Sequence, residues 1–128
     1  MELVKQPLWQ RALLGVLAFI LLVFTVPAYI NTANNPGLAN LSGEVSSLGS
    51  VAGAFLARQL ALVLIAIYGA LNGTKQPVMI GAFGIGFFNL HDAVFLSLLG
   101  EGDAGAITGL VIGGLAFVVL ITAARKSN

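Results

Sequence analysis

The sequence predicts an all-α integral membrane protein, built as an up-down bundle of four spanning helices in one domain, residues 1–128. Only 9% of its residues are Asp, Glu, Lys or Arg, against roughly 25% in an ordinary soluble domain. Hydrophobic residues make up 58% of the chain, and the mean hydropathy is +0.97. They form four continuous runs, each about the 20 residues that a helix needs to cross a hydrocarbon core of about 30 Å. Continuous rather than alternating runs exclude a transmembrane β-barrel.

The four predicted spans are 12–30, 51–71, 78–99 and 104–124. The first follows two basic residues and resembles a secretory signal, but it is longer than the apolar core of about 7–15 residues in such a signal. We therefore expect the first helix to be retained.

The connections between the spans differ in kind. In "NGTKQP", Gly73 suits a helix stop and Pro77 suits the first position of the next helix. This turn makes the second and third spans antiparallel neighbours, and "LGEGD" does the same for the third and fourth. The long segment 31–50 is a predicted outer loop, with a short interfacial helix at 41–48.

Basic residues outside the spans predict the orientation of the chain, because Lys and Arg concentrate on the cytoplasmic side. With both termini cytoplasmic, that side holds Lys5, Arg11, Lys75, Arg125 and Lys126. The opposite side carries no Lys or Arg, and its charged residues are Glu44, Glu101 and Asp103. The pattern indicates a bacterial inner-membrane protein. It leaves one basic residue, Arg58, inside the second span.

Arg58 and Asp92 are predicted to pair. The centre of the turn falls between Thr74 and Lys75, so Arg58 lies 16.5 residues before it and Asp92 lies 17.5 residues after it. In an antiparallel hairpin the two residues therefore share a depth. An arginine facing lipid at that depth costs at least ~2.5 kcal/mol, and Asp92 is the only acid within a span.

Other polar residues extend this predicted pocket. Asn89 lies three residues before Asp92 on the same helix face, while His91 and Gln59 match each other in depth. Tyr68 reaches inward from the cytoplasmic half. The pocket would open toward the outer side, where Glu44 of the long loop could cap it. The alternative is structural: a buried ion pair that only fixes helix register.

Several chemistries are disfavoured. The chain has no cysteine and one histidine, so we expect neither a metal site nor a cofactor. Neighbouring residues on a helix point about 100° apart, so His91 and Asp92 are not expected to form a catalytic dyad. "GAFGIG" lies within a span and indicates helix packing rather than nucleotide binding. A net charge of +1 offers no basic face for nucleic acid.

Small residues recur at four-residue spacing in three spans, and we expect these faces to contact one another. They are Gly105, Gly109 and Gly113 in the fourth span, Gly53, Ala57 and Ala61 in the second, and Ala82 and Gly86 in the third. The pattern serves packing within one bundle, and it serves equally a homo-oligomer joined through the glycines of the fourth span.

The run from Ala57 to Leu120 resembles small bacterial four-helix membrane proteins of unknown function and, more loosely, the DoxX-like group. The likeness lies in an arginine early in the second helix, a short basic turn, an Asp-Ala pair in the third helix and a small-residue fourth helix. Here the first and third features are Arg58 and Asp92-Ala93. The chain departs from the group in having Gln59 after the arginine and no histidine in the fourth helix. The resemblance implies a fold and no activity.

Three functions fit these observations. The first is binding of a small lipophilic or anionic ligand around Arg58. The second is an intramembrane enzyme, such as an isomerase, cyclase or hydrolase, with Asp92 as acid or base and Arg58 stabilising negative charge. The third is an accessory subunit of a larger membrane complex. A binding protein or enzyme should have a cavity that reaches Arg58, whereas a structural subunit should seal that arginine between helices.

Overall fold

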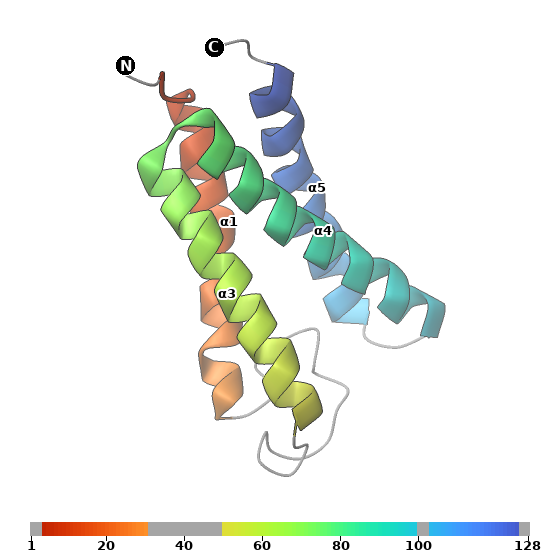
Figure 1. Ribbon diagram of the computed structural model, residues 1–128. Coiled ribbons are helices and arrows are strands. Elements are labelled where there is room, and N and C mark those ends of the chain that lie inside the picture. The colour runs from red at the N-terminus through yellow and green to blue at the C-terminus, as the bar shows by residue number, and fades with distance from the viewer. Residues whose placement is uncertain (1–3, 31–49, 100–102, 126–128) are drawn as a thin grey trace.

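The computed structural model describes residues 4–30, 50–99 and 103–125. These residues form four long helices and one short 3-10 helix (Figure 1). The elements are α1 (Leu8–Thr25), η1 (Pro27–Tyr29), α3 (Ser50–Asn72), α4 (Lys75–Leu99) and α5 (Asp103–Arg125). All four long helices are long and apolar enough to cross a membrane, which confirms the predicted all-α class with four candidate spans.

The helix boundaries differ from the predicted spans mainly in the first helix, where α1 ends at Thr25, five residues before the predicted end, and the short helix η1 follows it. α1 begins at Leu8, four residues before the predicted span, and so includes Arg11 in its first turn. α4 begins at Lys75, so Pro77 is its third residue rather than its first. A proline is tolerated there because the first four N–H groups of a helix have no partner within the helix. The predicted loop 31–49, its helix at 41–48 and Glu44 lie outside the described residues.

The helices pack around a shared core, and the contact between α4 and α5 is the most extensive, followed by that between α3 and α4 and then that between α1 and α3. α1 lies against α3, and α5 lies against α4, while α3 and α4 are joined by the turn at Gly73 (Figure 1). The core contains large side chains from all four helices, among them Leu14, Leu17, Leu21, Val63, Val78, Ile85, Ile112 and Val119. From the turn, α3 and α4 diverge along their length (Figure 1).

The end of the molecule that holds the α3–α4 turn, here called the turn end, is tied together by hydrogen bonds. Gly73 ends α3 with a φ of 81°, as predicted, and its carbonyl accepts a hydrogen bond of 2.7 Å from the Gln6 N–H. The Arg11 guanidinium donates to the carbonyls of Ala70 and Leu71, each at 3.1 Å. These carbonyls belong to the last turn of α3, where no intrahelical N–H is available.

The two ends of the chain's helical part also meet at the turn end. Gln10 in α1 donates to the Thr122 hydroxyl in α5 at 3.0 Å, and an isolated bridge joins Lys5 to Thr74. The start of α1, the α3–α4 turn and the end of α5 therefore lie together. This arrangement places four basic residues outside the predicted spans, Lys5, Arg11, Lys75 and Arg125, at one end of the molecule, as the sequence predicted.

Glycines of α5 pack against α4 within the chain. A Cβ added at Gly109 would lie 2.6 Å from the Asn89 carbonyl oxygen, and one added at Gly113 would lie 2.6 Å from Leu90 Cγ. This part of the small-residue face is therefore occupied by the protein's own helix. Gly105 belongs to α5, but its packing lies outside the described residues.

The small-residue face expected on the second span does not take part in this packing. Ala57 and Ala61 of α3 are exposed, and the packing of Gly53 lies outside the described residues. α3 meets α4 through a different set, in which Gly81 approaches Ala66. The crossing of the two helices, rather than the four-residue repeat, selects which small residues make contact.

Candidate functional site

A cavity of about 440 Å³ lies between α3 and α4 and extends along α4 from Ile80, near the turn end, to Asp92. Its size falls within the range of about 300–1,000 Å³ that is usual for small-molecule sites. We call it the α3–α4 groove. Its lining residues are Arg58, Leu62 and Ile65 from α3, and Ile80, Phe83, Gly84, Phe87, Phe88, His91 and Asp92 from α4.

The groove exists because the approach between α3 and α4 loosens with distance from the turn. Nearest the turn, a Cβ at Gly69 would overlap the backbone of Pro77. One added at Gly81 would lie 2.8 Å from Ala66 Cα, and one added at Gly84 would meet only the end of Leu62, at 3.1 Å. Backbone contact thus gives way to side-chain contact, and beyond Gly84 side chains line an open space.

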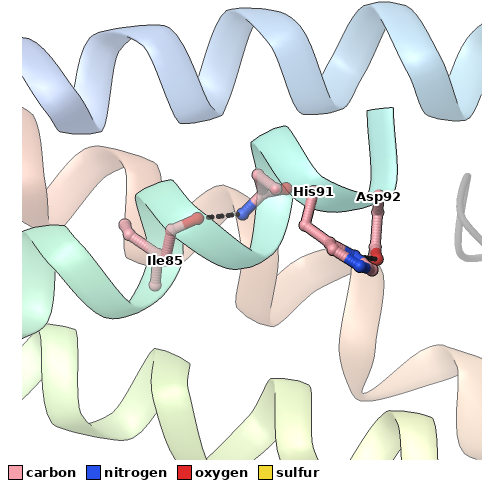
Figure 2. A network of polar contacts seen from close by, with 4 residues as sticks. Ile85, His91 and Asp92 are labelled. Atoms are coloured by element: carbon pink, nitrogen blue, oxygen red, sulfur yellow. Dashed lines mark hydrogen bonds and ion pairs between the residues drawn. The ribbon is translucent and has the colours of Figure 1, made fainter. Parts of the chain in front are cut away.

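His91 and Asp92 form the polar part of the α4 wall. His91 Nδ1 lies 3.1 Å from Asp92 Oδ1 (Figure 2). The His91 side chain is 60% exposed, and that of Asp92 is 21% exposed. These neighbours, which were not expected to form a catalytic dyad, are therefore in contact. Although their Cβ atoms point in different directions, the two side chains are long enough to meet outside the helix.

Arg58 forms the polar part of the α3 wall. It is exposed, and its Cζ lies 6.0 Å from the ring centroid of Phe55, within the usual range of a cation–π contact. Within the described ranges, no salt bridge of 4.0 Å or less joins Arg58 to Asp92. The predicted direct ion pair is therefore absent. Both residues line the same groove, but they do not meet across it. The two helices still touch nearby through Phe55 and Phe88, whose rings meet edge to face with centroids 5.8 Å apart.

The other three predicted site residues do not line the groove. Asn89 is buried, and its Nδ2 donates to the Ile85 carbonyl one turn earlier at 2.7 Å (Figure 2). Gln59 is buried at 3% exposure. Tyr68 is 60% exposed, and its hydroxyl accepts a hydrogen bond from Asn72 Nδ2 at 3.4 Å.

An aromatic ladder on α4 was not predicted. Phe83, Phe87, His91 and Phe95 stack in succession, with ring centroids 5.7, 6.1 and 6.1 Å apart and interplanar angles of 26°, 25° and 11°. Their spacing of four residues places them along one helix face, and this repeat is the sequence signal that could have revealed them. The stack fixes the His91 ring between two phenyl rings, beside Asp92.

The arrangement offers two kinds of chemistry. Arg58 presents a permanent positive charge to an anion or a polar oxygen. His91, oriented by Asp92 and by the ladder, can donate or accept a hydrogen bond or a proton. The described residues include no group of three or more His, Asp or Glu side chains placed to hold a metal ion.

Fold and site together define the class: an all-helical protein with four helices suited to crossing a membrane and a groove that is polar at one end. No family model, curated protein or solved structure matches the chain. Its resemblance to the DoxX-like group therefore stays a prediction.

Proposed function

We propose that this protein is an inner-membrane protein, with both termini cytoplasmic, that binds a small lipophilic molecule carrying a polar group in the α3–α4 groove. The observation that carries the proposal is one cavity that reaches Arg58, His91 and Asp92 while its other walls are apolar. A site with mostly hydrophobic walls and a few polar groups at one place is the usual design of a small-molecule pocket.

The membrane position of Arg58 supports the proposal. Arg58 lies eight residues from the first residue of α3, and Asp92 lies seven residues from the last residue of α4, or about 10–12 Å by helical rise. Charged residues at membrane depth are usually functional. A bound polar group would provide the arginine with a partner that the described part of the chain does not supply within salt-bridge distance.

A glycine on the groove wall provides the test. Replacing Gly84 with Leu should fill the groove next to Leu62, whose flexible end is the only nearby atom. Gly114→Leu is the matched control, because Gly114 is exposed on α5 and a Cβ there meets nothing within 4 Å.

The measurement is mass spectrometry of organic extracts from the purified full-length protein and both variants. We expect a lipophilic species enriched with the wild type and with Gly114→Leu, and depleted at least several-fold with Gly84→Leu. Equal extracts from all three proteins would refute ligand binding in the groove.

An intramembrane enzyme is the second candidate, and the His91–Asp92 contact favours it. In this version His91 is the acid or base and Asp92 orients it, whereas the sequence pointed to Asp92 itself. His91→Phe keeps an aromatic ring in the ladder and removes the imidazole. If the protein is an enzyme, expression of the wild type should change the amount of at least one lipid in the cell. Expression of His91→Phe should leave the amount of that lipid unchanged.

The third reading, an accessory subunit, has less support. It requires Arg58 to be sealed between helices, and Arg58 is exposed on the groove wall.

A further inference from the structure

We infer that the ligand of the α3–α4 groove is a single-chain amphiphile with an anionic head, and that it enters sideways from the bilayer. The head would lie at Arg58 and the chain would extend along the groove toward the turn end. This inference rests on the proposed function and adds the charge of the ligand, its shape and its direction.

The charge follows from the partners of the three polar residues. Asp92 is in contact with His91, so its carboxylate already has a hydrogen-bonding partner. Arg58 makes a cation–π contact with Phe55, and no described acid lies within salt-bridge distance of it. Arg58 is therefore the charged group of the groove without a hydrogen-bonding partner among the described residues, and a carboxylate or phosphate on the ligand complements it.

The shape follows from the distribution of polar and apolar residues along the groove. The polar residues gather at the end away from the turn, at Arg58 on one wall and Asp92 on the other. From Asp92 the α4 wall continues to Ile80, which is twelve residues and therefore about 18 Å along the helix. A long, narrow apolar surface with one polar end matches one extended hydrocarbon chain with one head group.

The direction of entry follows from which end of the groove is closed and which side of it is open. The turn end is closed, because Gly69 packs against Pro77 and Gly81 packs against Ala66. Along its side the groove is open, since Ile65 is 42% exposed and Phe87 is 56% exposed. If the four helices cross a bilayer, that open side faces lipid chains. A ligand therefore reaches the groove from within the membrane layer.

Photo-crosslinking tests the direction in which the ligand lies along the groove. The full-length protein, in nanodiscs of phosphatidylcholine, is exposed to palmitate that carries a diazirine at its chain end, and the labelled peptides are mapped. Labelling is expected in 62–65 and 80–83, near the turn end of the groove. Labelling near Arg58 or His91 instead would overturn the proposed direction.

Competitors with the same chain length test the charge, and a two-chain lipid tests the shape. Unlabelled palmitate should compete at least about tenfold better than hexadecanol, because a hydrogen bond to a charged group is worth a factor of ten or more. Hexadecyltrimethylammonium should compete least. If hexadecanol competes as well as palmitate, the anionic head is refuted, and if dipalmitoyl phosphatidylglycerol competes as well, the single chain is refuted.

Variants separate this inference from the proposed function. Arg58→Gln should lower labelling by about tenfold, Arg58→Lys should keep most of it, and Arg125→Gln, an exposed arginine at the end of α5, should change nothing. Full labelling of Arg58→Gln would overturn the role of the arginine but leave binding in the groove intact, provided that Gly84→Leu still blocks labelling. If Gly84→Leu is labelled like the wild type, both proposals fail.

Discussion

Replacing Gly109 with Ala is expected to destabilise the protein at the place where α5 packs against α4. A Cβ at Gly109 would lie 2.6 Å from the Asn89 carbonyl oxygen and 3.1 Å from Ala93 Cβ. The closer of these atoms is backbone, so it cannot rotate away. The added methyl group must therefore push the two helices apart.

A second glycine in the same helix isolates that effect. Gly114 lies five residues further along α5, and a Cβ there meets nothing within 4 Å. Both Gly→Ala changes gain up to about 1 kcal/mol from helix propensity, so that gain cancels in the comparison. Overpacking costs about 1–3 kcal/mol, and this is the expected difference in the free energy of unfolding between the two variants.

The assay is thermal unfolding of both variants and the wild type in the same detergent, followed by circular dichroism. For a chain of this length, each kcal/mol shifts the midpoint by about 4 °C, so Gly109→Ala should unfold about 4–12 °C below Gly114→Ala. Equal midpoints would refute the close approach of α5 and α4. The detergent-solubilised Gly109→Ala variant should have the same mass as the wild type. If the variant contains fewer subunits per particle and is as stable as the wild type, this glycine face lies between chains instead.

Two further predictions concern the turn end and the orientation of the chain. Arg11→Gln should lower the free energy of unfolding by about 1.5 kcal/mol, because two carbonyls at the end of α3 lose a charged donor. Arg11→Lys should recover part of the loss. Wild-type stability in Arg11→Gln would contradict the capping role of Arg11. Cysteines introduced at Asn34 and Asp103 should react with an impermeant thiol reagent in intact cells while one at Lys75 does not, and labelling at Lys75 would reverse the proposed orientation.

Features that depend on local sequence were predicted well. Hydropathy and run length gave the four helices because each long apolar run needs its backbone hydrogen bonds satisfied within itself in a lipid environment. The helix stop at Gly73 was predicted because glycine readily adopts positive φ. Counting residues from that turn also placed Arg58 and Asp92 at matching depths, and both residues line the same groove.

Features that depend on how the helices cross were not predictable from spacing. Matching depth along a hairpin does not decide which side chains meet: Arg58 contacts the Phe55 ring and Asp92 contacts His91, each on its own helix. Ala57 lies on an exposed face of α3, whereas Ala66, on the buried face, meets Gly81 of α4. A helical repeat determines which residues share a face, but only the packing of whole helices decides whether that face meets another helix, a cavity or the surroundings.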